Sequence, residues 1–230
     1  MSSSLWNAVT WDIARAGGWT AYVLFTLAVI VGLLLSTQIQ SPSRWPRLIN
    51  SELHNFLSLL SAIFVGVHIL AVWIDPFTHF GISDILVPFL SSYRTIWMAL
   101  GIIALYFGIA IGISTWLRPY IGYIWWRRLH VLTLGIYVIA TLHGVFTGSD
   151  TQTWWALDLY SGSSILVGLL LVRRIYLVFK KRAATRTGGP AAHAKAHARA
   201  GQSLSAQRQG EGQMRAEQPF QSVSNLRTIR

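Results

Sequence analysis

Residues 53–74 read LHNFLSLLSAIFVGVHILAVWI, an unbroken apolar stretch with a histidine near each end, His54 and His68. A second apolar stretch, residues 129–147 with the sequence LHVLTLGIYVIATLHGVFT, repeats this arrangement with His130 and His143. A helix rises about 1.5 Å per residue, so each pair spans roughly 20 Å along its helix. Two such helices side by side would present two histidine levels, His54 with His130 and His68 with His143.

The composition places this chain in a membrane. Of its 230 residues, 53% are hydrophobic and only 12% are charged, and eleven are tryptophans. A soluble domain needs a more polar surface than this. The chain has no cysteine, which excludes disulfides, iron–sulfur clusters and thiolate ligands and leaves imidazole as the best ligand for a transition metal.

Five apolar stretches are long enough to cross a bilayer as helices. They run approximately over Trp19–Gln38, Leu53–Ile74, Thr95–Thr115, Leu129–Thr147 and Leu157–Phe179. The first and third connections are basic, whereas the second and fourth are acidic with Arg94 as their only base. By the positive-inside rule we expect a multi-pass protein of the cell membrane, with its N-terminus outside and its C-terminus in the cytosol.

The two ends of the chain differ from this central part, residues 19–179. Residues 1–18 lack the pattern of a signal peptide, and we expect a short interfacial segment there. Residues 180–230 are rich in Ala, Gly, Gln and Ser, and their ten basic and two acidic residues supply +8 of the formal net charge of +11. We expect this basic tail to be disordered and attracted to anionic membrane lipid, without binding nucleic acid.

Four of the seven histidines fall inside the second and fourth apolar stretches. A polar side chain at membrane depth is costly and usually functional. A single histidine there would be explained by a hydrogen bond to a neighbouring helix, but four at matched depths favour paired ligation of two stacked haems. Each level offers two neutral imidazoles to one six-coordinate iron, which leaves no axial position for a substrate and suits electron transfer.

The spacing in the fourth stretch does not fit an ideal helix. At about 100° per residue, a 14-residue step returns to within roughly 40° of the same face, whereas a 13-residue step misses it by about 140°. We therefore expect this segment to tilt, to unwind locally or to turn one imidazole sideways. Gly135 and Gly144 would permit that departure.

The paired spacing resembles the ferric reductase-like transmembrane domain. This is the haem core of eukaryotic ferric reductases, of NADPH oxidases and of the bacterial membrane subunit that feeds periplasmic methionine-sulfoxide reductase. Three further segments look like the bacterial branch: WDIARAGGWTAYVLF (residues 11–25), DPFTHFGISDILVPFLSSYRTIW (75–97) and WWRRLHVLTLGIYVIATLHGVFTGSDT (125–151). The resemblance covers about residues 10–180.

The resemblance implies that His54, His68, His130 and His143 are axial ligands of two b-type haems in a cytochrome b-like oxidoreductase subunit. It also implies electron flow from the cytosolic to the outer face. Two features depart from the family. The tail has no glycine-rich phosphate-binding motif, so we expect that the chain cannot oxidise NADPH alone and receives electrons from FMN or FAD through a partner. Val72 occupies the position of a further histidine of the oxidases, so dedicated superoxide production is not expected.

Arginines near the expected haems are candidate partners for haem propionates. Arg127 and Arg128 lie within one helical turn of His130, and Arg44 and Arg47 are expected on the same side, although positive-inside signalling alone would also explain these arginines. Arg94 opposes the local charge rule, and we expect it to have a structural role at the outer haem. His79 is expected to be a surface residue rather than a ligand.

We therefore predict an all-α integral membrane protein with about five transmembrane helices, a bis-histidine two-haem core and a disordered basic tail. We expect it to conduct electrons from a cytosolic flavoprotein, reduced flavin or membrane quinol to an outer-face ferric chelate or partner reductase. Two alternatives stay open: a transporter whose histidines relay protons or bind metal ions, and a haem-bearing assembly or anchor subunit. The lack of carboxylates deep inside the apolar stretches and of an inverted repeat counts against the transporter.

Overall fold

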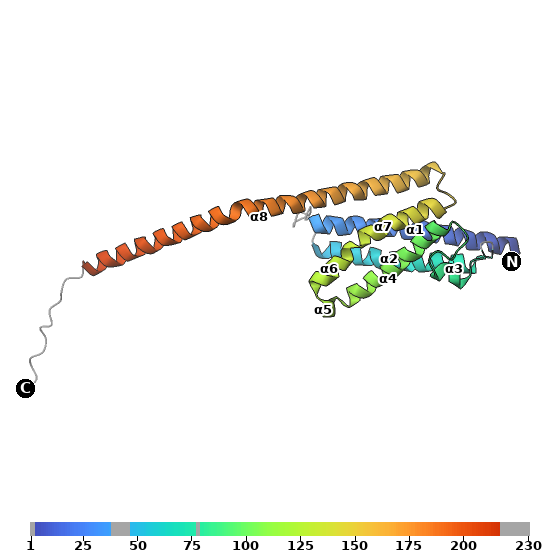
Figure 1. Cartoon of the computed structure of the whole chain (residues 1–230), viewed down its shortest axis with the longest axis horizontal. Coiled ribbons are helices and arrows are strands. Elements are labelled where there is room, and N and C mark those ends of the chain that lie inside the picture. Colours follow the sequence, from blue (N-terminus) through green and yellow to red (C-terminus); the bar gives the residue numbers. More distant parts are fainter. Residues whose placement is uncertain (1–2, 38–46, 77–78, 217–230) are drawn as a thin grey trace, which may run out of the picture. The chain divides into compact units, whose positions relative to one another are not determined.

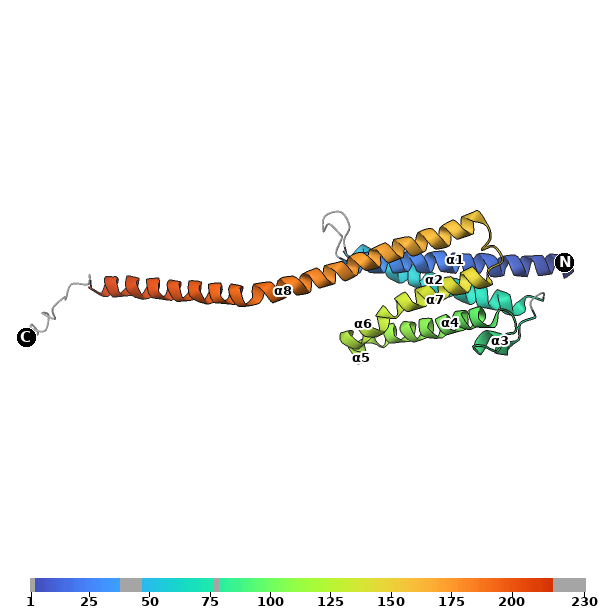
Figure 2. The same cartoon turned by 45° about the horizontal axis from the view of Figure 1, so that its top comes forward.

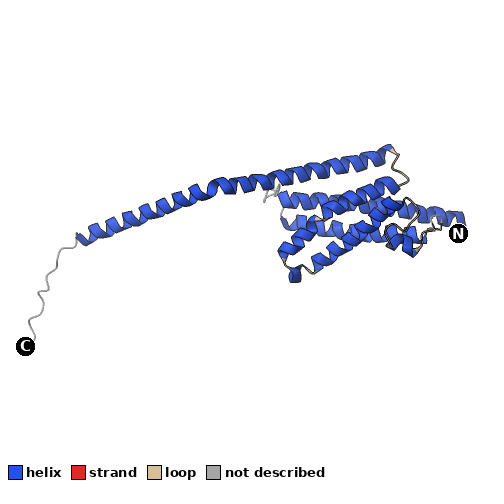
Figure 3. Cartoon of the chain, in the orientation of Figure 1, coloured by secondary structure: helices blue, strands red, loops and turns tan. Residues whose placement is uncertain are grey.

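The computed structural model describes residues 3–37, 47–76 and 79–216, with side chains placed at 5–36, 51–76, 79–183, 198 and 201–208. Every regular element in these ranges is a helix (Figure 3). In chain order the helices are α1 (Ser3–Thr37), α2 (Arg47–Ile74), α3 (Ile82–Leu86), α4 (Thr95–Trp116), α5 (Arg118–Ile121), α6 (Tyr123–Val131), α7 (Thr133–Thr147) and α8 (Trp154–Ala216).

Five helical segments are long and apolar enough to cross a membrane. They are Leu5–Ser36 in α1, Ser51–Ile74 in α2, Thr95–Trp116 in α4, Tyr123–Thr147 across α6 and α7, and Trp154–Ala183 in α8. Large apolar side chains on these segments are exposed, Leu59 and Leu169 to 64% each. A lipid surround accounts for such exposure, which water does not favour. The expected all-α architecture with five helices long and apolar enough to cross a membrane is confirmed, and it is compatible with a multi-pass membrane protein.

Helices α1, α2, α4 and α7 run side by side and form two pairs (Figures 1 and 2). The α1 helix packs along α2, the α4 helix packs along α7, and α1 also contacts α7. Within the described ranges, α2 and α7 are not closely packed against each other. Each histidine-bearing helix is therefore supported by a partner helix of its own, α1 for α2 and α4 for α7.

Polar contacts hold α1 to the rest of the bundle, and three of them involve Thr10, Arg15 and Ala21. The buried Thr10 hydroxyl donates to Asp75 Oδ1 at 2.8 Å, just beyond the end of α2. Arg15 donates to both carboxylate oxygens of Asp150, at 3.0 and 2.7 Å, in the loop between α7 and α8. Ser61 of α2 donates to the Ala21 carbonyl of α1 at 3.1 Å. Two-point contacts between arginine and a carboxylate are among the stronger polar contacts in proteins, so this end of α1 is firmly placed.

A tyrosine cluster joins α1, α7 and the beginning of α8. The rings of Tyr22 and Tyr160 meet edge to face, with centroids 4.8 Å apart. The Tyr22 hydroxyl shares hydrogen bonds with Tyr137, at 3.2 Å, and with Ser163, at 2.8 Å. All three tyrosines are buried, and their hydroxyls supply polar partners that an apolar bilayer cannot supply.

The first helix differs from the sequence prediction. Residues 1–18 were expected to form a separate interfacial segment, but the helix that begins at Ser3 continues without a break to Thr37. Polar residues such as Thr10, Asp12 and Arg15 interrupt the apolar pattern, so apolar length alone did not predict that the helix begins this early. Tertiary contacts explain why the helix forms: Thr10 bonds to Asp75, and Ala14 is buried to 3% exposure.

The C-terminal tail also differs from the prediction. Residues 180–216, expected to be disordered, are the second part of the continuous helix α8. The Ala, Gln, Lys and Arg residues of this segment are good helix formers, although Gly188, Gly189 and Pro190 work against a helix. Its described side chains are exposed, which agrees with the expected absence of a core. Residues 217–230 of the expected disordered tail lie outside the described residues.

Two glycines of α7 allow a test of the tyrosine cluster. A methyl group at Gly144 would overlap the hydroxyl of the buried Tyr160, whereas a methyl group at Gly135 would meet nothing within 4 Å. We expect Gly144→Ala to cost about 1–3 kcal/mol by overpacking and to lower the midpoint of thermal unfolding in detergent. Gly135→Ala should leave the midpoint unchanged or raise it slightly, because alanine favours a helix. Equal midpoints for the two variants would contradict this packing.

Candidate functional site

The four histidines of the second and fourth membrane segments lie on three helices. His54 and His68 belong to α2, His130 to the last turn of α6, and His143 to α7. All four side chains are partly buried. We call His54 and His130 the first histidine pair and His68 and His143 the second histidine pair.

The structure brings the first histidine pair together. The ring centroids of His54 and His130 are 6.0 Å apart, and the ring planes are inclined by 73°. An imidazole nitrogen binds a metal at about 2 Å, so two imidazoles on opposite sides of one metal have centroids roughly 6 Å apart. The first pair therefore has the ring separation that one shared metal ion requires.

The second histidine pair has one member on each helix pair. His68 and His143 lie near enough for their imidazoles to interact electrostatically. Each ring is anchored to the partner of its own helix: His68 Nδ1 donates to the Ala14 carbonyl of α1 at 2.7 Å, and His143 Nδ1 donates to the Trp97 carbonyl of α4 at 2.8 Å. The two imidazoles are thus held from opposite sides of the bundle.

These hydrogen bonds fix the tautomer of three of the four imidazoles. In the first pair, His54 Nδ1 donates to the Ala28 carbonyl of α1 at 2.9 Å. A carbonyl oxygen only accepts, so the proton is on Nδ1 and the neutral ring keeps its lone pair on Nε2. Metal-binding histidines in proteins are commonly oriented in this way, with one nitrogen bonded to a carbonyl and the other on the metal. Each of the three rings therefore keeps an Nε2 lone pair that could accept a metal.

His130 is held differently. Its Nδ1 is buried without a hydrogen-bond partner in the described part of the chain. Instead its ring stacks on Trp126 at 4.9 Å and an interplanar angle of 27°. Trp126 is itself fixed, because its indole N–H donates to the Thr115 hydroxyl at 3.2 Å and the Arg118 guanidinium lies 4.7 Å from its ring. Aromatic packing thus replaces the carbonyl bond at this one histidine.

The helix that carries His130 and His143 is interrupted between them. Residue Val131 ends α6 and Thr133 begins α7, with Leu132 between the two helices. The expected departure from an ideal helix is therefore present, as a local break. It does not occur at Gly135 or Gly144, which both lie inside α7. A 13-residue step on a straight helix would place His130 and His143 on different faces, and the break falls between the two residues.

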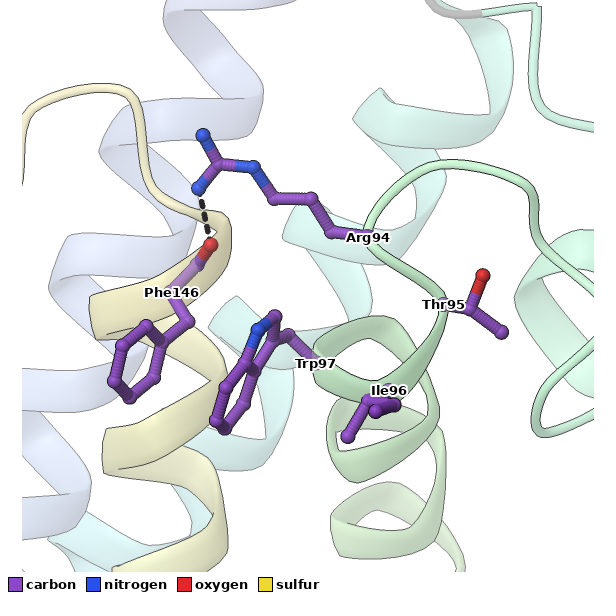
Figure 4. A pocket seen from close by; sticks show the side chains of 5 residues that line it. All are labelled: Arg94, Thr95, Ile96, Trp97 and Phe146. Atoms are coloured by element: carbon purple, nitrogen blue, oxygen red, sulfur yellow. Dashed lines mark hydrogen bonds between the residues drawn. The ribbon is translucent and has the colours of Figure 1, made fainter.

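Arg94 ties the start of α4 to the end of α7. Its backbone has φ 43° and ψ 51°, a left-handed conformation that is uncommon for a residue with a side chain. Its guanidinium donates to the Phe146 carbonyl, one of the last carbonyls of α7 (Figure 4). Below it the rings of Trp97 and Phe146 stack at 3.9 Å, and these residues with Thr95 and Ile96 line a shallow hollow of about 470 Å³. Arg94 thus has a structural role at the His143 end, and its contact with a haem stays a prediction.

Arg127 and Arg128 are exposed beside His130 and contact aromatic rings. Arg127 donates to the Tyr123 hydroxyl at 2.6 Å, and the Arg128 guanidinium lies 4.9 Å from the Trp125 ring. Arg44 lies outside the described residues, as does the side chain of Arg47. His79 is exposed in the loop after α2, in agreement with its expected surface role.

Sequence reasoning missed Arg174 of α8. This partly buried side chain lies near enough to both Arg127 and His130 to interact with them electrostatically. The signal was present in the sequence, because Arg173 and Arg174 interrupt the fifth apolar stretch. Two neighbouring guanidinium groups repel each other and favour an anion that both can bind.

No family model matches this chain, and neither a curated protein nor a solved structure matches it.

Proposed function

We propose that this chain is a ferric reductase-like membrane cytochrome b that passes electrons across the membrane through two b-type haems. His54 and His130 would hold one haem, and His68 and His143 the other. The observation that carries this proposal is the orientation of the imidazoles. Three of the four histidines have Nδ1 occupied by a carbonyl and Nε2 left for a metal, and the rings of the first pair have the separation that one metal needs.

A haem fits these residues better than a bare metal ion does. Histidines and carboxylates do not gather in groups of three or more within the described ranges, whereas a structural zinc site uses about four protein ligands. A haem iron takes only its axial ligands from the protein. When bound, the haems would supply two one-electron redox centres, one near each end of the bundle.

The charges at the two ends support an orientation for the proposed path. The end of the bundle with the first histidine pair carries four arginines, Arg118, Arg127, Arg128 and Arg174. The end with the second pair carries the acidic residues Asp12, Asp75 and Asp150, and of its bases Arg15 is paired with Asp150 and Arg94 bonds to the Phe146 carbonyl. The positive-inside rule then places the first pair at the cytosolic face, with the N-terminus outside and the C-terminus inside. Electrons would enter there from a flavoprotein, reduced flavin or quinol. They would leave near the second pair to a ferric chelate or partner reductase.

The arginines have specific parts in this proposal. Arg127 and Arg174 would bind the propionates of the haem at the first pair, since a guanidinium matches a carboxylate with two parallel hydrogen bonds. Arg94 has one N–H on the Phe146 carbonyl and further N–H groups that could reach a propionate at the second pair.

The haem content of the purified chain tests the proposal directly. We expect about two haem b per chain, and a low-spin spectrum because both axial positions are filled by imidazole. His54→Leu and His130→Leu should each remove mainly one haem, and His68→Leu and His143→Leu mainly the other, as measured by pyridine haemochrome analysis and EPR.

An exposed histidine supplies the control for these variants. His79→Leu should keep the full haem content, because His79 is exposed in the loop after α2. Less than half a haem per chain after expression with adequate haem would overturn the proposal, and a metal-binding or proton-relaying transporter would then be the better explanation.

The source of electrons gives a second test. The chain shows no glycine-rich phosphate-binding motif, so NADPH alone should leave its haems oxidised. Adding a flavin reductase with free flavin should reduce them, and the visible spectrum follows both steps. The protein can also be placed in vesicles loaded with ferric chelate. The enclosed chelate should be reduced only when the electron donor is added outside to vesicles whose outer face carries Arg127. Rapid haem reduction by NADPH without a partner would show that the chain carries its own nucleotide site.

The two adjacent arginines of α8 make a matched pair of variants. Arg174→Gln removes a cation near His130, and the ferrous state of the first haem should lose about 1 kcal/mol of stabilisation, which lowers its reduction potential by tens of millivolts. Arg173→Gln is the control, because Arg173 is exposed and should leave the potential unchanged. Redox titration of the two haems separates the variants. Equal shifts would show that Arg174 acts only through the net charge of the chain.

A further inference from the structure

The three carbonyls that accept imidazole protons share a position in their helices. Each lies four residues before a glycine of the same helix. The pairs of acceptor and glycine are Ala14 and Gly18 for His68, Ala28 and Gly32 for His54, and Trp97 and Gly101 for His143. Two of these pairs lie on α1 and one on α4, so the arrangement occurs on both sides of the bundle.

Helix geometry gives this spacing a physical meaning. The carbonyl of residue i accepts the N–H of residue i+4, and the side chain of residue i+4 lies beside that same carbonyl. Two threonines of α7 show this position, because Thr141 donates to the Tyr137 carbonyl at 2.7 Å and Thr147 donates to the His143 carbonyl at 2.5 Å. A glycine at i+4 leaves the second lone pair of the carbonyl open to a donor from another helix.

The imidazoles occupy the space that these glycines leave. A methyl group at Gly101 would lie 2.6 Å from His143 Nδ1, one at Gly18 would lie 3.0 Å from His68 Nδ1, and one at Gly32 would lie 3.2 Å from His54 Cε1. Real methyl carbons essentially never approach a neighbouring atom as closely as 2.6 Å. An alanine at position 101 would therefore overlap the His143 ring. An alanine at position 18 or 32 would fit only if the His68 or His54 ring moved.

We infer that Gly18, Gly32 and Gly101 are positioning residues for the three histidines. Each glycine uncovers one backbone carbonyl, the carbonyl takes the Nδ1 proton, and the bond fixes both the tautomer of the ring and the direction of Nε2. That these nitrogens bind haem iron rests on the proposed function, whereas the placement of the rings and their protons does not. His130 Nδ1 makes no such bond to any described residue, so the second histidine pair has two of these supports and the first has one.

Alanine variants of the full chain test the inference, with Gly108→Ala as the matched control. Gly108 lies on α4 like Gly101, but a methyl group there meets nothing within 4 Å. We expect Gly101→Ala to remove the haem at the second histidine pair and Gly18→Ala to lower the occupancy of that same haem. Gly32→Ala should lower only the occupancy of the haem at the first pair, and by the smallest amount of the three. Where a haem is kept, loss of the Nδ1 bond makes the ring a weaker donor, so its potential should rise and a high-spin EPR signal should appear. Gly108→Ala should retain both haems and the low-spin spectrum.

NMR of the same chains with ¹⁵N-labelled histidine gives a second readout that does not depend on haem. We expect Nδ1-protonated rings for His54, His68 and His143 in the unsubstituted chain, and loss of that state at His143 alone in Gly101→Ala. A chain without haem that still shows these tautomers would refute the proposed function and keep the inference. A chain with two haems whose content, potentials and tautomers are unchanged in Gly101→Ala and Gly18→Ala would overturn the inference alone. If Gly101→Ala does not accumulate, Gly18→Ala and Gly32→Ala decide the same question.

Discussion

The bond from an imidazole Nδ1–H to a main-chain carbonyl of the adjacent helix is the constraint on which the rest of the bundle depends. It requires the donor helix and the acceptor helix to lie close, and small residues at a membrane helix interface permit that approach. The bonds occur between α2 and α1 and between α7 and α4, which are also the two pairs of helices that pack along each other. Helix pairing and histidine orientation therefore have one origin.

The two ends of the bundle achieve their histidine geometry by different means. At the second pair both rings are bonded to carbonyls, so main-chain atoms set their direction. At the first pair His130 follows a break in its helix and rests on Trp126, so its direction depends on side-chain packing and on where the break falls. An imidazole without a carbonyl partner is a weaker electron donor to a metal. Nearby cations such as Arg174 add to this difference, because they stabilise the more electron-rich state of a bound group.

Apolar length and histidine spacing were sufficient to predict the all-helical, five-span architecture, and the structure confirms it. The same spacing predicted that His54 faces His130 and indicated a distortion of the fourth span, and both features are present; the role of the four histidines as ligands stays a prediction. Three features of the structure were not predicted. The extension of α1 depends on the tertiary bond from Thr10 to Asp75, and the helical course of α8 follows local propensity where composition indicated disorder. Arg174 becomes significant only once folding brings it near Arg127 and His130.

Because α2 and α7 do not pack closely against each other, a group bound between their histidines would add a connection between the two helix pairs. Membrane helices gain little from apolar contact with each other, because lipid is equally apolar, and they depend on close packing and polar bonds. The described parts of α2 and α7 lack close packing against each other: α2 packs along α1, and α7 packs along α4 with a smaller contact to α1. On the proposed function, each haem would join His54 or His68 of α2 to a histidine of the α4–α7 side, and so would bond the two helix pairs to each other. A ligand that binds only the assembled state stabilises that state in proportion to its affinity. The four imidazoles would then hold the two helix pairs together as well as bind the redox centres.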